Sequence, residues 1–217
     1  MMKKGLFVTF EGIDGSGKTT QLELLEQELA SRIPRVRTVR EPGGTPTGER
    51  IRALLADRGL NILPPAELLL FFSSRAQLIG ELIEPELRKG SVLLCDRFHD
   101  ATVAYQCYGR GLSLDTIRML EQAFVLPVKP DITFLLDCSF TTAAKRMSAR
   151  GARARIELMD RAFFERVREG YHALARQEPE RVMVIDAAGS AATIHAHISK
   201  LFFRRAGDVQ ARSGRGS

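Results

Sequence analysis

Residues 12–20 read G-I-D-G-S-G-K-T-T, and this stretch decides the fold of the chain. It matches the phosphate-binding pattern G-x-x-x-x-G-K-[ST] at four residues, Gly12, Gly17, Lys18 and Thr19. The residues before it, 6–10, form a short apolar run typical of a buried parallel strand. After it, leucines recur at helical spacing in 22–29. This strand–loop–helix context predicts a site for a nucleoside triphosphate.

The loop has the chemistry that a polyphosphate needs. Glycines let backbone N–H groups surround the phosphates, and the new helix adds unpaired donors and the positive end of its dipole. Lys18 is expected to reach the β- and γ-phosphates, and the Thr19 hydroxyl is expected to ligate Mg²⁺.

The composition is that of a soluble globular protein: 217 residues, of which 44% are hydrophobic and 27% charged. No apolar run approaches the roughly 20 residues of a membrane span. Glu11 interrupts the apolar run that follows Lys3 and Lys4, so we recognise no signal peptide. The three cysteines show no C-x-x-C spacing, which argues against a disulfide framework and a zinc site. The sequence therefore predicts a cytoplasmic protein without a membrane partner.

The net charge of +6 is unevenly distributed along the chain. Four arginines and one aspartate lie in 204–217, so half of the excess charge sits in a run rich in Gly, Ser, Ala and Arg. This composition predicts a disordered basic tail after a single domain of residues 1–203. A basic tail can act as a nucleic-acid arm. Binding of several phosphates explains the charge of the body, however, and we expect no nucleic-acid partner.

Strand-like and helical patterns alternate along the chain. Four β-prone runs follow the first, at 36–40, 92–96, 132–137 and 182–186. Helical patterns occupy 18–31, 46–57, 65–84, 113–124, 139–149, 160–177 and 190–203. This order predicts a three-layer α/β fold, with a five-stranded parallel sheet flanked by helices. Because ligands bind beyond the carboxyl ends of such strands, Glu41, Asp96 and Arg97 should gather at the phosphate loop. Pro85 is expected to end or kink the helix of 65–84.

Two strand ends carry candidate functional residues. Asp96 and Arg97 directly follow the apolar run 92–95. An acid at this position orients Mg²⁺ or its waters, and a planar guanidinium suits a phosphate. A salt-bridged turn is the alternative, but the place beside a phosphate loop favours function. For the stretch 38–45, T-V-R-E-P-G-G-T, a plain turn and a functional loop stay equally open.

Phe71 and Arg75 lie four residues apart on an expected helix and therefore share one face. An aromatic ring for stacking and a guanidinium aimed at a carbonyl edge suit a nucleobase. Taken alone, such a pair is more often a core aromatic and a solvated charge.

Residues 146–155 read R-M-S-A-R-G-A-R-A-R, with four arginines around Gly151. A solvated basic helix is one interpretation, and a mobile lid over transferring phosphates is the other. A phosphate acceptor has a second pKa of about 6, so it is largely ionised at pH 7 and needs no catalytic base. The difficulty is then to bring two polyanions together. Arginines that do this contribute about 10³–10⁵ in rate in related chemistry, which favours a lid at about residues 148–158.

Taken together, these motifs resemble the bacterial thymidylate kinase family. The shared stretches are F-E-G-I-D-G-S-G-K-T-T, R-E-P-G-G-T, L-L-F-x-x-x-R-A-Q, D-R-F-x-D-A-T-x-A-Y-Q and R-G-A-R-A-R-I-E, in this order between residues 4 and 200. Many phosphate-loop kinases share single motifs, but the set is specific. The resemblance implies a P-loop kinase fold and a homodimer that transfers a phosphoryl group from MgATP to dTMP, giving dTDP for dTTP synthesis.

The resemblance assigns roles to individual residues. ATP would bind to Gly12, Ile13, Asp14, Gly15, Ser16, Gly17, Lys18, Thr19, Thr20 and Arg146. The catalytic residues would be Lys18, Arg97, Asp14, Asp96, Arg150, Arg153 and Arg155. Thr19 and Asp96 would hold Mg²⁺. Because only Ile13-Asp14-Gly15-Ser16 separates the loop glycines, the loop lacks an extra basic residue, and the family variant with lid arginines is implied.

The implied dTMP site consists of Asp14, Arg40, Pro42, Phe71, Arg75, Arg97, Thr102, Tyr105, Gln106 and Glu157. In it, Phe71 would stack on thymine, and Arg75 would form a hydrogen bond to its O4 carbonyl. Arg40 and Arg97 would hold the acceptor phosphate, and Tyr105 would crowd the sugar C2′.

The remaining dTMP-site residues would complete the contacts. Asp14 would meet the 3′-hydroxyl or a Mg²⁺-bound water. Thr102 and Gln106 would read the base edge. Glu157 would contact the substrate or a metal-bound water from the lid.

The sequence departs from the family pattern at two positions. Ala154 replaces an acid that is common in the family lid, and Ala101 replaces a serine after Asp100.

The nearest alternative function is a kinase of another nucleotide or of a deoxynucleoside, whose hydroxyl would need a base such as Asp96 or Glu11. The second is an ATP-gated binding or regulatory protein that could use its basic tail on nucleic acid.

Overall fold

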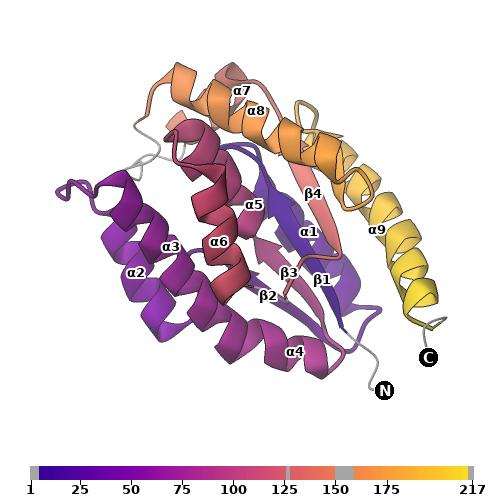
Figure 1. The fold of residues 1–217 in the computed structure, drawn as a ribbon. Coiled ribbons are helices and arrows are strands. Elements are labelled where there is room, and N and C mark those ends of the chain that lie inside the picture. The colour runs from indigo at the N-terminus through magenta and orange to yellow at the C-terminus, as the bar shows by residue number, and fades with distance from the viewer. Residues whose placement is uncertain (1–4, 126–127, 150–158, 215–217) are drawn as a thin grey trace.

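The computed structural model describes residues 5–125, 128–149 and 159–214, with side chains of the last range as far as residue 207. Its strands are β1 Leu6–Glu11, β2 Val36–Arg40, β3 Val92–Asp96, β4 Ile132–Asp137 and β5 Val182–Asp186. They form one parallel sheet in the order β2-β3-β1-β4-β5 (Figure 1). The predicted α/β fold with a five-stranded parallel sheet is confirmed.

The helices are α1 Lys18–Ala30, α2 Pro46–Ala56, α3 Pro64–Leu78, α4 Glu84–Arg88, α5 His99–Thr102, α6 Leu114–Phe124, α7 Phe140–Ser148, α8 Arg161–Gln177 and α9 Ala191–Gly214. Two π-helical segments, η1 Ile79–Ile83 and η2 Val103–Gly109, continue α3 and α5. None of the helices among the described residues is long and apolar enough to cross a membrane.

Alternate residues of β1 pack on opposite sides of the sheet. Val8 and Phe10 belong to a core cluster that contains the leucines of α1 and the apolar face of α9. Phe7 belongs to a second cluster, with apolar residues of α3, η1 and α6. Figure 1 accordingly shows α1 on one side of the sheet and α3, α4 and α6 on the other. All six residues of β1 are buried, as expected for a central strand covered on both faces.

The long helix predicted for 65–84 continues past Pro85. Its α-helical part α3 ends at Leu78, the π-helical segment η1 follows, and Pro85 is the second residue of α4. A proline lacks the N–H and crowds the preceding turn, and a wider π turn accommodates it without ending the helix.

The helical segment of residues 99–109, formed by α5 and η2, has no counterpart among the predicted helices. Its sequence has no clear helical spacing of leucines. Tertiary packing forms it instead, because Val103, Ala104 and Tyr105 are buried and η2 lies against α8.

Where the sequence predicts a disordered tail from residue 204, the structure has α9 continuing to Gly214. Phe202 is buried and Ala206 packs against the same core cluster. Arg205 Nη2 donates to the carbonyl oxygen of Glu180 at 2.8 Å. These contacts extend the helix beyond the point at which the composition becomes polar.

Candidate active site

The phosphate loop joins β1 to α1 at the carboxyl edge of the sheet. Gly12 and Gly15 have φ angles of 135° and 82°, which L side chains rarely adopt. A Cβ atom at Gly12 would collide with the carbonyl oxygen of Leu136, and one at Gly15 with that of Ala143. Glycine is therefore required here for both backbone conformation and close packing.

The N-terminus of α1 differs from those of four other helices. Side chains cap α2, α6, α7 and α8, namely those of Thr45, Ser113, Ser139 and Asp160. No side chain of a described residue caps α1. Its first backbone N–H groups, together with the helix dipole, are therefore available to an anion.

Lys18 and Thr19 begin α1 and lie beside Asp96. Lys18 is 6% exposed, and its Nζ donates to the carbonyl oxygens of Gly12 at 3.1 Å and Ile13 at 2.9 Å. Burial, followed by the charge of Arg97, lowers the pKa of Lys18 to about 8. Thr19 Oγ1 donates to Asp96 Oδ2 at 2.5 Å, so the hydroxyl and carboxylate expected to hold Mg²⁺ are in contact.

The other loop residues complete the same surface. Thr20 is exposed in the first turn of α1, whereas the Ser16 hydroxyl is buried without a partner among the described residues. Arg146 reaches the loop from α7: its Nη1 donates to the Ser16 carbonyl oxygen at 3.2 Å, and its Nη2 to that of Ala187 at 2.9 Å. The structure thus brings together all ten residues expected to bind ATP.

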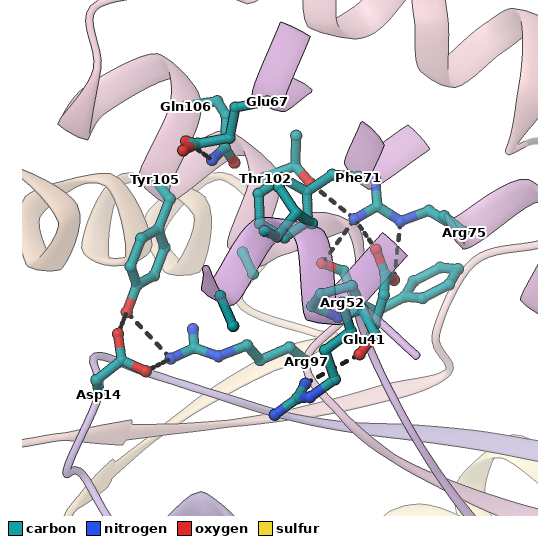
Figure 2. Close-up of a pocket in the computed structure, with 15 residues that line it drawn as sticks. Asp14, Glu41, Arg52, Glu67, Phe71, Arg75, Arg97, Thr102, Tyr105 and Gln106 are labelled. Atoms are coloured by element: carbon teal, nitrogen blue, oxygen red, sulfur yellow. Dashed lines mark hydrogen bonds and ion pairs between the residues drawn. The ribbon is translucent and has the colours of Figure 1, made fainter. Parts of the chain in front are cut away.

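A pocket of about 190 Å³ adjoins the loop at Asp14 (Figure 2). Eight of the ten residues expected to bind dTMP line it: Asp14, Pro42, Phe71, Arg75, Arg97, Thr102, Tyr105 and Gln106. They come from the loop after β1, the loop after β2, α3, the end of β3, α5 and η2. Figure 2 shows linked side chains around Arg97 and around Arg75, and a further linked pair, Glu67 and Gln106.

Arg75 is 1% exposed and is held in a fixed position. Its guanidinium is ion-paired with the buried Glu41, and Nη2 also donates to Thr102 Oγ1 at 2.7 Å. Burial raises the pKa of Glu41, and the charge of Arg75 opposes this. The nitrogen Nη1 is buried without a partner among the described residues. A buried donor left unpaired is costly, so the site favours a ligand with an acceptor here.

Arg97 lies at the end of β3 with a φ of 70°, a conformation uncommon outside glycine. Its Nη2 donates to Asp14 Oδ1 at 2.7 Å and to the Tyr105 hydroxyl at 3.0 Å. Tyr105 in turn donates to Asp14 Oδ2 at 2.7 Å. Burial alone would raise the pKa of Asp14, but Arg97 and Lys18 hold it below its usual value. Arg97 therefore stays charged at the end of the pocket nearest the phosphate loop.

A family model for thymidylate kinase matches residues 10–198. The chain belongs to the thymidylate kinase family. It is 49% identical over 190 residues to a thymidylate kinase of Geotalea daltonii, covering 84% of this chain and 89% of that protein. Over 200 residues it is 46% identical to one of Pseudomonas syringae pv. tomato, covering 91% and 94%. The crystal structure of thymidylate kinase from Ehrlichia chaffeensis has a TM-score of 0.77 and 34% identity, covering 92% and 98%. The family resemblance is confirmed.

Within this family framework, Arg40 lies in a different place from the one expected. Its guanidinium is paired with Glu49, with Nη2 and Oε2 2.8 Å apart, and it does not line the pocket formed by the described residues. Arg52 of α2 lines the pocket instead, and its Nη1 donates to the Pro42 carbonyl oxygen at 2.9 Å. Burial and the charge of Arg40 lower the pKa of Arg52. The sequence motif T-V-R-E-P-G-G-T ends before α2, so it does not point to Arg52, which lies one helical turn beyond Gly48.

Glu67 and Arg110 are further site residues to which no sequence motif points. Glu41 and Glu67 line the pocket, and Arg110 is ion-paired with Glu67. The arginines and the glutamate expected in the lid, Arg150, Arg153, Arg155 and Glu157, lie outside the described residues, as does Ala154. No cluster of three or more His, Cys, Asp or Glu side chains suited to a metal ion occurs among the residues that are described.

Glu11 is fully buried below Arg97. Its Oε1 accepts the backbone N–H of Phe98 at 2.7 Å, and its Oε2 accepts the Tyr171 hydroxyl at 2.8 Å. Tyr171 also accepts a hydrogen bond from Arg97 Nη1 at 3.1 Å. Burial, followed by the charge of Asp100, raises the pKa of Glu11 to about 8. The folded protein therefore holds a proton on Glu11 over a pH range in which the unfolded chain does not.

This raised pKa predicts a pH-dependent difference in stability between the wild type and Glu11→Gln. A raised acid pKa stabilises the fold below the unfolded value of 4.5, and this contribution is lost as pH rises through about 8. The wild type should therefore lose stability relative to Glu11→Gln between about pH 5 and 8.5. Urea denaturation across this range measures the difference. Glu23→Gln, on the exposed face of α1, should show a flat difference, and an equally flat profile for Glu11→Gln would contradict the prediction.

Proposed function

We propose that the protein transfers the γ-phosphoryl group of ATP to dTMP, producing ADP and dTDP for dTTP synthesis in the cytoplasm. The observation that carries this proposal is the pocket beside the phosphate loop, which has a buried unpaired donor at Arg75 and a fixed guanidinium at Arg97. The distribution of charge suits a ligand with a neutral base at one end and a phosphate at the other.

The base end of the pocket suits thymine. Phe71 lines this end and offers an aromatic face for stacking. Arg75 Nη1 needs an acceptor, and the O4 carbonyl of thymine supplies one. Arg75 donates a hydrogen bond to Thr102, and this contact links α3 to α5 beside the base.

The phosphate end favours an acceptor that is already ionised. Arg97 and Arg52 line this end, and neither Glu11 nor Asp96 is placed to act as a base for a nucleoside hydroxyl. Glu11 is fully buried with both oxygens bonded, and Asp96 is bonded to Thr19. A phosphate acceptor needs no such base. These contacts support a nucleotide rather than a deoxynucleoside as the acceptor.

The donor side of the proposal rests on the loop and on α1. The uncapped start of α1 and Lys18 would hold the β- and γ-phosphates of ATP, with Arg146 beside the loop. Thr19 and Asp96 form an oxygen donor set that fits Mg²⁺, which typically binds through one or two protein ligands and the substrate phosphates. When bound, Mg²⁺ would neutralise charge on the transferring phosphate. Arg150, Arg153 and Arg155 are proposed as the lid cations, and Glu157 as a lid contact to dTMP.

A panel of acceptors tests the proposed function. ADP release should be measured with ATP, Mg²⁺ and each of dTMP, dUMP, dCMP, dGMP and AMP at matched concentrations. We expect dTMP to have the highest kcat/KM, by more than about tenfold. A smaller preference would contradict the substrate assignment, and ATP binding without any acceptor-dependent ADP release would favour a regulatory protein.

Arg75→Ala is expected to reduce kcat/KM for dTMP by about 10²-fold while leaving the Kd for ATP within about threefold. The substitution removes the donor for the O4 carbonyl and leaves Glu41 buried without its ion pair. Steady-state kinetics for dTMP and nucleotide titration for ATP measure the two effects. Because loss of the ion pair also affects folding, thermal unfolding of the variant is the control. Equal losses for dTMP and ATP would show that α3 serves only as scaffold.

We infer that the protein forms a homodimer through an apolar surface on α3 and α6. Leu63 and Leu69 are 64% and 54% exposed, and Met119 and Phe124 are 62% and 57% exposed. Figure 1 shows α3 and α6 side by side on the outer face of the molecule. Large exposed apolar residues on neighbouring helices, here together with the N-cap of α3, are typical of a protein interface.

Leu69→Glu is expected to convert the dimer to a monomer at micromolar concentration, because it places a charge in an apolar interface. Light scattering coupled to gel filtration gives the mass directly. Val184→Glu, at an exposed apolar position of β5, is the matched control and should leave the mass unchanged. A wild-type protein that is monomeric under the same conditions would refute the inferred homodimer.

A further inference from the structure

The carboxylate of Glu67 is buried in the wall of the pocket, where two side chains of the described residues donate to it. It is 1% exposed and lies in the first turn of α3. Arg110 donates to it twice, from Nε to Oε1 at 3.2 Å and from Nη2 to Oε2 at 3.1 Å. Gln106 Nε2 donates to Oε1 at 3.1 Å (Figure 2). Glu67 is therefore anchored by a cation on one side and faces a pocket residue on the other.

This arrangement fixes the orientation of the Gln106 amide. A carboxylate held by a guanidinium accepts hydrogen bonds and donates none. A glutamine amide has one donor end and one acceptor end, so its nitrogen must face Glu67 and its oxygen must face away. None of the described residues donates to Gln106 Oε1 through a side chain or backbone hydrogen bond. The amide thus presents an acceptor that is still unused.

We propose that Glu67 is a positioning residue for base selection, because it makes Gln106 offer an acceptor to the N3–H group of the base. Arg75 Nη1 offers a donor to the oxygen at C4 of the same base. Thymine and uracil carry a C4 carbonyl and an N3–H group, which match this donor and acceptor. Cytosine carries an amino group at C4 and an unprotonated N3, which mismatch both. The inference rests on the proposed function and names the residue that sets its selectivity.

The expected effect is on selectivity rather than on activity in general. A site built to hydrogen-bond its substrate rejects an analogue with the wrong groups by about 10⁴–10⁵-fold. If Glu67 could donate as well as accept, the Gln106 amide could rotate and present its nitrogen to N3 of cytosine. One of the two mismatches would then disappear, and discrimination against cytosine should weaken.

Glu67→Gln tests this, because an amide at position 67 can either donate or accept. We expect the ratio of kcat/KM for dTMP over dCMP to fall by at least about tenfold. The ratio for dTMP over dUMP should stay within about twofold, because these two bases share the same edge and differ only in the methyl group. Glu86→Gln, on α4 and away from the pocket, is the control and should leave both ratios unchanged.

A Gln106→Ala background shows whether Glu67 acts through Gln106. There, Glu67→Gln should not lower the dTMP over dCMP ratio further. An unchanged ratio in the single variant, an equal change in the dUMP ratio, or a further drop in the Gln106→Ala background would each overturn the proposal. If Glu67→Gln does not fold, Arg110→Gln replaces it, because an unpaired buried carboxyl can carry a proton and donate. A wild type that does not phosphorylate dTMP would refute the proposed function instead.

Discussion

Replacing Arg97 with alanine is expected to lower kcat/KM for dTMP by about 10³-fold or more. Arg97 is the charged group that Asp14 and Tyr105 hold at the phosphate end of the pocket. Without it, two polyanions must approach without a fixed cation between them, and Asp14 is left without its ion pair. A loss of 10³ corresponds to about 4 kcal/mol of transition-state stabilisation. Steady-state ADP release with saturating MgATP and varied dTMP measures it.

Arg37→Ala is the matched control for this loss. Arg37 is an exposed arginine on the edge strand β2, and its removal changes the net charge by the same amount. We expect its kcat/KM to stay within about twofold of the wild type. A loss of less than about tenfold for Arg97→Ala, with the variant folded, would show that another cation carries the acceptor phosphate.

Lys18→Ala is expected to reduce kcat by about 10³-fold and to weaken ATP binding. Lys18 Nζ donates to the carbonyl oxygens of Gly12 and Ile13 within the phosphate loop. In the proposed function, this loop holds the β- and γ-phosphates of ATP. Rapid-quench single-turnover rates, with ATP affinity titrated separately, distinguish loss of chemistry from loss of binding.

The pH dependence of ATP affinity provides an independent check on Lys18. Its pKa of about 8 means that the free protein loses this charge as pH rises, whereas a bound polyphosphate favours the charged form. Wild-type affinity should therefore weaken by about tenfold between about pH 7 and 9, and Lys18→Ala should lose this dependence. Lys89→Ala, at an exposed lysine, should keep it. Equal pH profiles for the wild type and Lys18→Ala would contradict the assignment.

The central strands could be predicted from the sequence because strands buried on both faces are continuous apolar runs, whereas the edge strand β2, V-R-T-V-R, is indicated by its β-branched residues. The runs at 36–40, 92–96, 132–137 and 182–186 have the bounds of β2 to β5. The segment 99–109 could not be predicted in this way, because its helix depends on contact with α8 rather than on local spacing. The same holds for residues 204–214, where contacts such as Arg205 with Glu180 extend α9.

In the candidate site, too, some residues could be predicted from the sequence and others could be placed only by tertiary contacts. Spacing places Asp14 in the phosphate loop and puts Phe71 and Arg75 on one helix face. The family resemblance then names all three as site residues. Arg40 and Arg52 could not be distinguished, because both lie near the same turn. Only the ion pair of Arg40 with Glu49 shows which guanidinium lines the pocket.

By itself, the sequence determined the α/β class, the phosphate loop and the family, because each depends on local pattern and short-range spacing. Tertiary structure decided how the side chains of the pocket are held. Glu67 meets Gln106 across 39 positions of the chain, and Glu11 meets Tyr171 across 160. Contacts over such separations leave no periodic signal in the sequence. They arise only when the sheet and its helices bring distant residues together.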